Sequence, residues 1–288
     1  MKKNIIYLLS LALFVFFTCS SAMAKDVMTL AVHDYAPYYN NEGKGMMIDL
    51  YQAICDDAGI DVTFKVLPVK RAIEYLFQDK VDAFSPGHIF MTPEQVKQVS
   101  LVKTFSVVGI FMYYDPGKKK TVVYNSIADL KGKKLAVVVN SPWIPAYTAA
   151  GVAFEEIQTP ELLVKMVRAG RVDFIETTLL AGMSLTNNLF KTEMQGFDFV
   201  INQAIECSVA FHTSNPKSMA LMAKFNASFE KIKKNGTYIR IFESYWGKNN
   251  IQKETLPADL AAFGVQKASL EAFSKYKRNA WDKIEESK

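Results

Sequence analysis

The chain has 288 residues, half of them hydrophobic, with 34 Lys and Arg against 29 Asp and Glu and a formal net charge of +5. This charge is too small to favour a nucleic-acid-binding protein, for which a strongly basic surface is expected. The apolar content is sufficient for a sizeable core, and the length suits one large domain or two lobes.

Residues 1–24 have the pattern of a secretion signal. Lys2 and Lys3 precede an apolar run through Phe17, and Ala22-Met23-Ala24 matches the site that signal peptidase cleaves. The run is shorter than the roughly 20 residues that cross a bilayer, which disfavours a membrane anchor. Lipid attachment at Cys19 is disfavoured by the bulky residues before it. We expect cleavage after Ala24 and a soluble periplasmic or secreted product with a charge of +3, because two lysines are removed.

Only Cys55 and Cys207 remain in the mature chain. Two cysteines do not form a disulfide framework of the kind that holds small secreted domains together. A single bridge between them and a pair of unpaired buried thiols are both consistent with the sequence.

Strand-like and helical segments alternate from the start of the mature chain. The predicted order is a strand over 28–34, a helix over 47–58, a strand over 61–67, a helix over 71–78 and a strand over 81–85. Alternation of this kind favours an α/β layered sheet.

The same arrangement returns later in the chain. Residues 161–175 repeat the order of residues 71–84, in which a helix leads to a basic residue, Val, Asp and an apolar strand. The helix starts at Thr92-Pro93 and Thr159-Pro160 also match, each with Thr as the N-cap and Pro at the first helical position. The repetition predicts two lobes built on one plan.

Two long extended runs lie around the second repeat. Residues 105–120 lead out of the first repeat, and residues 199–216 lead back. The chain is therefore expected to cross between the lobes twice. A helix over 217–242, interrupted at Gly236, follows the return.

The order of these segments resembles the family 3 solute-binding proteins, the periplasmic receptors of ABC importers for polar amino acids and related solutes. The resemblance covers roughly residues 28–247 and rests on HDYAPYY, GKGMMIDLYQAI, KVDAF, TPEQ, ADLKGKKLAVVVNS, GRVDFI and NGTYIRIFESYWG in this order. It implies a two-lobed α/β fold of the type II periplasmic-binding-protein kind, with two crossover hinge strands and a central cleft.

The resemblance also implies where the lobes lie in the sequence. The first lobe comprises 25–108 and 207–247, and the second comprises 109–206. A C-terminal helical extension over 248–288 lies beyond them. We expect it to pack on the first lobe, with apolar positions at Leu260, Phe263, Leu270 and Phe273.

Ligands of open α/β sheets bind beyond the carboxyl ends of the strands, so the turn at 85–88 is a candidate cleft wall. Ser85 and His88 are polar, Pro86 rigidifies the backbone, and Gly87 allows a ligand to approach closely. An ordinary exit from a strand into a loop is the alternative.

Two positions that the resemblance implies as ligand anchors are altered. The family's Thr-x-x-Arg, whose arginine holds a ligand carboxylate, is replaced by TPEQ, in which Gln95 also fits a capping box with Thr92. The family's aspartate, which binds the ligand ammonium, corresponds to Thr178, and Glu176 lies two residues earlier on the same face of an extended segment. Amino-acid specificity is therefore not carried over.

Two further positions could bind an anion. Arg71, at the start of a helix, could pair with an anionic ligand or lie exposed on the surface. Asn140 and Ser141 follow the strand LAVVV and precede Pro142, where a helix N-terminus could offer backbone N–H groups.

Aromatic residues near the strand ends could cover a ligand. Tyr35, Tyr38 and Trp143 could supply aromatic faces that stack on a cation, or they could belong to the core.

His33, Asp34 and His88 follow two strand ends and suggest a metal site. Their spacing has no zinc signature, and neither HxxxH nor CxxC occurs in the sequence. We expect no metal and no cofactor, and we keep Asp34 as a ligand-binding candidate.

These features favour a monomeric, non-catalytic receptor that captures a small polar or charged solute by closing its cleft and delivers it to an ABC permease in the inner membrane. We assign no catalytic residue and expect no nucleic-acid partner. One alternative is a periplasmic enzyme similar to the cyclohexadienyl dehydratases, with Glu176 or His88 as general acid. The other is a ligand sensor that docks on a membrane receptor.

Overall fold

In the computed structural model, which describes residues 25–190 and 193–266, the strands form one mixed eight-stranded sheet in the order β2-β1-β3-β8-β4-β7-β5-β6. The strands are β1 (Asp26–Val32), β2 (Ile60–Val66), β3 (Ala83–Phe84), β4 (Val99–Tyr114), β5 (Leu135–Val138), β6 (Phe154–Ile157), β7 (Phe174–Thr178) and β8 (Phe197–His212). The α-helices are α2 (Met46–Ala58), α3 (Val69–Phe77), α4 (Pro93–Val96), α5 (Ile144–Ala149), α6 (Pro160–Arg168), α7 (Leu179–Leu189), α8 (Pro216–Lys234) and α9 (Thr237–Trp246). The predicted signal peptide lies outside the described residues.

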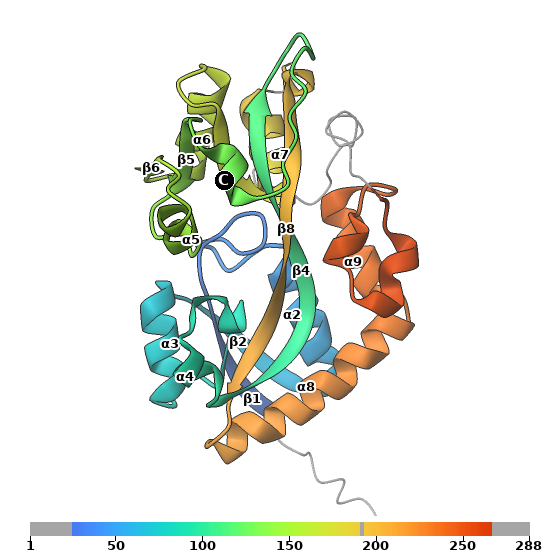
Figure 1. The fold of residues 1–288 in the computed structure, drawn as a ribbon. Coiled ribbons are helices and arrows are strands. Elements are labelled where there is room, and N and C mark those ends of the chain that lie inside the picture. Colours follow the sequence, from blue (N-terminus) through green and yellow to red (C-terminus); the bar gives the residue numbers. More distant parts are fainter. Residues whose placement is uncertain (1–24, 191–192, 267–288) are drawn as a thin grey trace, which may run out of the picture.

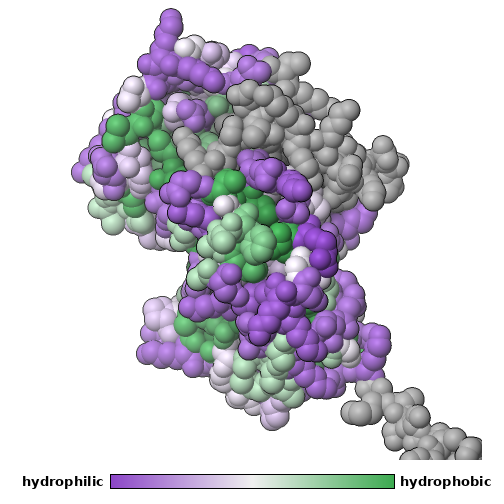
Figure 2. Space-filling view, turned by 90° about the vertical axis from the view of Figure 1, so that its right-hand side faces the viewer, coloured by the Kyte–Doolittle hydropathy of each residue, from purple (hydrophilic) through white to green (hydrophobic). Residues whose placement is uncertain are grey.

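The sheet serves two lobes, which Figure 1 shows one above the other and Figure 2 shows as two bodies joined at a narrower waist. In the first lobe, β1 pairs in parallel with β2 and β3. In the second lobe, β5 pairs in parallel with β6 and β7. The α/β fold with two lobes and two crossover strands is thereby confirmed, whereas the lobe boundaries at 108/109 and 206/207 stay predictions.

Strands β4 and β8 run through both lobes as one antiparallel ribbon, paired from Val99↔His212 to Tyr114↔Phe197. Their register shifts between Lys103 and Phe105 and again between Gly109 and Ile110. Such bulges bend a strand and increase its twist. The carbonyl of Thr104, inside the first bulge, accepts a hydrogen bond from the Tyr238 hydroxyl at 2.9 Å, so the irregular backbone is not left unpaired.

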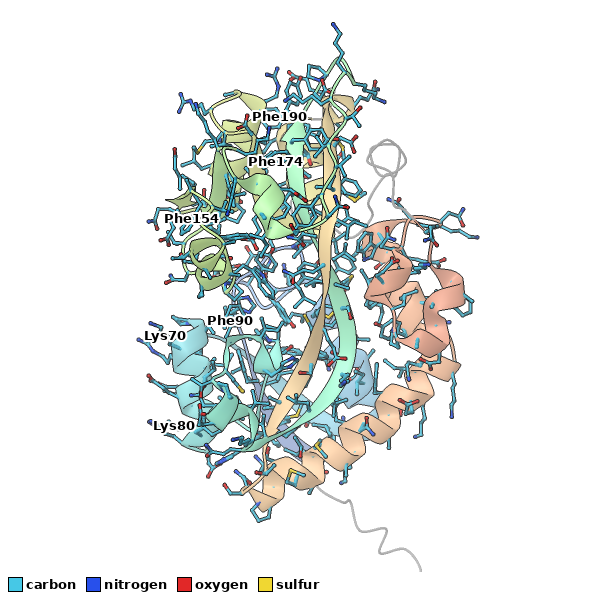
Figure 3. The ribbon with its side chains drawn as sticks, in the orientation of Figure 1. Lys70, Lys80, Phe90, Phe154, Phe174 and Phe190 are labelled. Carbon is cyan, nitrogen blue, oxygen red and sulfur yellow. The ribbon has the colours of Figure 1, made fainter. Side chains whose placement is uncertain are left out.

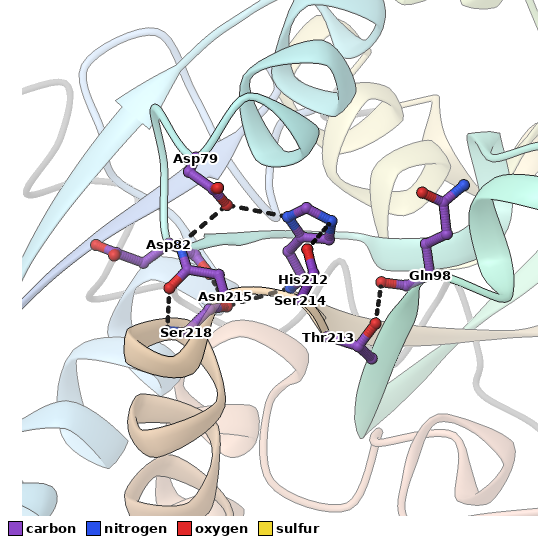
Figure 4. Close-up of polar contacts among 8 residues, drawn as sticks. All are labelled: Asp79, Asp82, Gln98, His212, Thr213, Ser214, Asn215 and Ser218. Carbon is purple, nitrogen blue, oxygen red and sulfur yellow. Dashed lines mark hydrogen bonds and ion pairs between the residues drawn. The ribbon is translucent and has the colours of Figure 1, made fainter.

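The lower end of β8 is fixed to the first lobe by polar contacts (Figure 4). Nδ1 of His212 lies 3.0 Å from Oδ1 of Asp79, and the Asn215 amide donates to the same oxygen at 2.9 Å. The Ser218 hydroxyl donates to the carbonyl of Asp82 at 2.6 Å. These contacts join the end of β8 and the start of α8 to the turn before β3.

The predicted helix boundaries are mostly confirmed. Thr92 and Thr159 are N-caps whose side chains accept hydrogen bonds from the third helical residue, and Pro follows each of them. Gly236, at φ 78°, separates α8 from α9 as predicted. Cys55 and Cys207 are buried and free, which settles the open alternative in favour of two thiols.

The C-terminal extension differs from the prediction in its described part. It forms short 3-10 helices, η4 (Lys253–Thr255) and η5 (Ala258–Phe263), rather than an α-helix. Leu260 is buried in the main core, but Phe263 is 61% exposed, so only one of these two apolar positions packs. Leu270 and Phe273 lie outside the described residues. Within the described chain, no helix has the length and apolarity needed to cross a bilayer.

Gly45 positions the loop between β1 and α2. Its backbone, at φ 138° and ψ 172°, lies in a region that is essentially restricted to glycine. A Cβ there would lie 2.4 Å from the carbonyl oxygen of Tyr38. This close approach lets the amides of Met46 and Met47 donate to the carbonyls of Pro37 and Tyr38 at 3.0 and 3.1 Å. The start of α2 is therefore paired with the loop.

Replacing Gly45 by Ala should lower the free energy of unfolding by about 3 kcal/mol or more, because it adds a backbone clash to a disfavoured conformation. Gly43→Ala is the matched control: Gly43 also has positive φ, but a Cβ there meets nothing within 4 Å. We expect Gly43→Ala to lower the free energy of unfolding by about 1–2 kcal/mol. Urea denaturation measures both, and equal losses would contradict the role given to Gly45.

Candidate functional site

The two lobes meet where the loop after β1 reaches the end of β7. The Tyr35 hydroxyl donates a hydrogen bond to Oγ1 of Thr178 at 3.3 Å. Thr178 is the last residue of β7 and the N-cap of α7. In Figure 1, the blue loop after β1 lies at the junction of the lobes, close to α5. This places the contact at the carboxyl end of a strand, where ligands of α/β sheets bind.

Four aromatic rings form a row at this junction, which runs from His33 through Tyr35 and Tyr38 to Phe105. Tyr35 stacks on His33 with ring centroids 6.0 Å apart and on Tyr38 at 5.7 Å, with interplanar angles of 10° in both pairs. Tyr38 stacks in turn on Phe105 of β4 at 6.0 Å. Phe90 packs with its ring tilted 71° to that of His33, at 5.7 Å. The row gives the junction a rigid apolar wall with polar atoms at its edges.

Two polar atoms in this row are buried without a partner. Neither Nδ1 of His33 nor the hydroxyl of Tyr38 makes a hydrogen bond of acceptable geometry to another described residue. Burial lowers the pKa of His33 to about 4, so the ring is uncharged at neutral pH. Burial raises the pKa of Tyr38, an effect that the nearby Thr178 hydroxyl opposes. Unpaired buried polar atoms are costly, so a bound ligand or water is the natural partner for them.

Glu176 is the acidic group on the second-lobe side. Its Oε2 accepts a hydrogen bond from the Ser141 hydroxyl at 2.8 Å. Burial raises its pKa from 4.5 to about 7, and hydrogen bonds from Ser141 and Tyr147 oppose the rise. Burial is the main cause that raises the pKa of Tyr35, and the negative charge of Glu176 raises it further. The two side chains are therefore close across the junction. Glu176 and Thr178 thus both lie at the junction, and a ligand site shared by them stays a prediction.

Asp34 lies next to this site but is exposed. It accepts a hydrogen bond from the Asn41 amide at 2.6 Å. Burial is the largest cause that raises its pKa, and the charge of Glu161, at the start of α6 in the second lobe, raises it further. The edge of the junction is therefore acidic on both sides.

Ser85 and Gly87 have interior roles that differ from their predicted ones. Ser85 is fully buried, and its hydroxyl lies 2.7 Å from that of Tyr39 and 2.8 Å from that of Tyr51. Gly87 has φ 70°, and a Cβ would lie 2.3 Å from Oγ of Ser208, so glycine is needed for packing against β8 and not for access by a ligand. The sequence alone could not show that the Ser85 side chain points inward.

His88 and Gln95 are also held within the first lobe. Nδ1 of His88 lies 3.3 Å from the Ser208 hydroxyl. Gln95 forms the predicted capping box. Its side-chain Oε1 accepts a hydrogen bond from the backbone N–H of Thr92 at 2.9 Å, and its backbone N–H donates to Oγ1 of Thr92 at 3.3 Å. The capping interpretation is confirmed, and a ligand contact of Gln95 stays a prediction.

The turn before α5 does not offer the helix N-terminus that was expected after Asn140. Asn140 is exposed with φ 60°, and the helix begins only at Ile144 and has six residues. The amide of Trp143 donates to the Ser141 hydroxyl at 3.3 Å, and Trp143 packs against the core of the second lobe. Ser141 therefore belongs to the junction through Glu176, whereas Trp143 is mainly a packing residue.

Arg71 is exposed in the first turn of α3 and has no ion pair with another described residue. Figure 3 shows its neighbour Lys70 at the end of α3 nearest the second lobe, with Phe90 beside the gap and Lys80 at the far end. The start of α3 thus lies on the side of the second lobe, and Arg71 stays a candidate ligand-binding residue.

A family model for the bacterial extracellular solute-binding proteins, family 3, matches residues 28–248. The chain belongs to this family. It is 27% identical over 252 residues to the ABC transporter arginine-binding protein 1 of Escherichia coli (strain K12), covering 82% of this chain and 96% of that protein.

Two solved structures show the same fold as this family 3 protein. An ancestral arginine-binding protein bound to arginine has a TM-score of 0.59 at 23% identity, covering 78% of this chain and all of that one. A histidine kinase sensor domain with similarity to periplasmic binding proteins has a TM-score of 0.61 at 19% identity, covering 77% of this chain and 97% of that one.

Tyr147 and Phe105 lie beside candidate residues at the junction of this family 3 protein, although the sequence did not indicate them. Tyr147 faces Glu176 from α5, and Phe105 closes the ring row from the hinge strand β4. Only their apolar surroundings are visible in the sequence, and these are typical of core residues. In the described residues, no group of three or more His, Cys, Asp and Glu side chains could hold a metal ion.

Glu176 should give the protein a pH-dependent stability. Because folding raises its pKa from 4.5 to about 7, the unfolded chain loses this proton at a lower pH than the folded one. The contribution of Glu176 to the free energy of unfolding is therefore constant below about pH 4, falls between about pH 4.5 and 7, and is constant again above this range.

We expect the fall in the free energy of unfolding between about pH 4.5 and 7 to be smaller by roughly 1–3 kcal/mol in Glu176→Gln. Urea denaturation across the pH range measures this difference. The control is Glu155→Gln, at an exposed position on the edge strand β6, which should keep the wild-type profile. An unchanged profile in Glu176→Gln would assign the pH dependence to other groups.

Proposed function

We propose that this family 3 protein is an exported, monomeric receptor that binds a small polar or charged solute between its lobes and delivers it to an ABC importer. The main observation is the interlobe contact between Tyr35 and Thr178, with Glu176 and Ser141 beside it and the unpaired Tyr38 hydroxyl next to it. These groups come from both lobes, so a solute among them would favour the closed arrangement.

The relatives support the solute class and the route. The Escherichia coli relative is named for arginine binding and for an ABC transporter. Small solutes with several hydrogen-bonding groups suit a site that offers a carboxyl, several hydroxyls and an aromatic wall.

An enzymatic function is the second candidate, because a half-buried carboxyl whose pKa lies near 7 is suited to general acid catalysis. Turnover of a bound compound by the purified protein would establish it. Binding without chemical change would favour the receptor.

A thermal-shift screen of the mature chain against amino acids, polyamines, carboxylates, aromatic acids and sugars should give at least one solute that binds. Binding at a hundredfold excess over Kd stabilises the folded state by about 2.7 kcal/mol. We expect Tyr35→Phe to weaken binding of that solute several-fold, because the variant loses the interlobe hydrogen bond. Tyr75→Phe, on α3, is the control. Normal affinity of Tyr35→Phe would place the binding site elsewhere.

Deleting the gene in its source bacterium should abolish uptake of the labelled solute if an importer is served. Complementation with the wild-type gene should restore uptake. Normal uptake combined with a lost transcriptional response to the solute would favour the sensor function instead.

A further inference from the structure

The side chains at the lobe junction provide acceptors for N–H donors. Glu176 accepts hydrogen bonds from Ser141, through Oε2, and from Tyr147, and a carboxylate has about four acceptor sites, so it can accept from a further donor. The Tyr35 hydroxyl donates to Thr178 and keeps its oxygen as an acceptor. The buried Tyr38 hydroxyl makes no hydrogen bond of acceptable geometry to a described residue, although the Thr178 hydroxyl lies near it. The site therefore matches a ligand that is rich in N–H groups.

The ring row itself supplies no positive charge, and Lys70 and Arg71 lie outside it at the start of α3. His33 is uncharged at neutral pH because burial lowers its pKa to about 4. Asp34 and Glu161 add negative charge from opposite lobes, as the effect of Glu161 on the pKa of Asp34 shows. A cationic solute would be attracted to this junction and an anionic group repelled from it.

Most backbone donors of the turn between β5 and α5 are already used. The amide of Ser141 donates to the carbonyl of Val138 at 3.0 Å, and the amide of Ile144 donates to the carbonyl of Ser141 at 3.3 Å. The amide of Trp143 is taken by the Ser141 hydroxyl, and Pro142 has no N–H. A carboxylate placed at this turn would find few free backbone donors to replace its hydration.

We propose that the solute held at this junction is an amine or guanidine that carries positive charge and lacks a carboxylate. This inference rests on the proposed function, which places the solute between the lobes. Glu176 is the counter-ion, the Tyr35 and Tyr38 hydroxyls accept further N–H groups, and the ring row forms the apolar wall beside the carbon chain. If the ligand were an amino acid, its carboxylate would bind the first backbone N–H groups of α7, which lie at the same junction.

The test uses pairs of solutes that differ only by a carboxylate. The mature chain is unfolded in guanidinium and refolded to release any bound solute, and calorimetry then compares agmatine with arginine, and putrescine with ornithine. We expect the amine of at least one pair to bind about tenfold or more tightly than its parent amino acid.

The outcomes separate this inference from the proposed function. Equal or tighter binding of the parent amino acids would overturn the inference and leave the receptor function standing. Binding of only neutral or anionic compounds from the wider screen would do the same. If no compound of the screen binds, both proposals fail.

Matched variants test the role of Glu176. Glu176→Gln should lower the affinity for the amine by about tenfold or more, because the counter-ion is lost while the hydrogen-bonding shape is kept. Glu155→Gln should leave this affinity within about twofold, because Glu155 is exposed on the edge strand β6. Circular dichroism checks that Glu176→Gln is folded. Unchanged amine affinity in a folded Glu176→Gln variant would overturn the inference.

Discussion

The antiparallel ribbon of β4 and β8 is the constraint on which the whole structure depends. Neither lobe has a complete sheet without it, because β3 pairs with β8 in one lobe and β7 pairs with β4 in the other. The two register shifts lie inside the ribbon, where they permit bending without loss of the outer pairings. The lobes can therefore move as units while most of their backbone hydrogen bonds stay intact.

The contact that holds the lobes together at the junction is weak. One hydrogen bond between neutral hydroxyls, at 3.3 Å between Tyr35 and Thr178, contributes about 1 kcal/mol or less. In the proposed receptor, a solute that bonds to Glu176 and to the tyrosine hydroxyls would add interactions that exist only when the lobes are close. Its binding would therefore shift the balance between open and closed arrangements, which is the property a receptor requires.

The inward direction of Ser85, whose predicted role changed, has one physical reason. Ser85, Tyr39, Tyr51 and Thr104 form a chain of buried hydroxyls, with Tyr51 3.2 Å from Thr104. Such a network satisfies polar groups inside the first lobe and joins the turn at Ser85 to the hinge strand. A polar residue after a strand is equally consistent with a cleft wall and with an internal hydrogen bond. The direction of the Ser85 side chain depends on a hydrogen bond to Tyr51, which is more than thirty residues away in the sequence.

The sequence by itself determined the α/β class, the two lobes, the crossings and the helix starts at Thr92 and Thr159, because strand and helix periodicity and capping depend on residues close together in the chain. It also predicted a shared site for Glu176 and Thr178, since alternate residues of a strand share a face. Only the tertiary structure decided that Tyr35 reaches Thr178, 143 residues away, and that Ser85 turns inward. Contacts over such separations depend on how the lobes pack, and no local pattern encodes that packing.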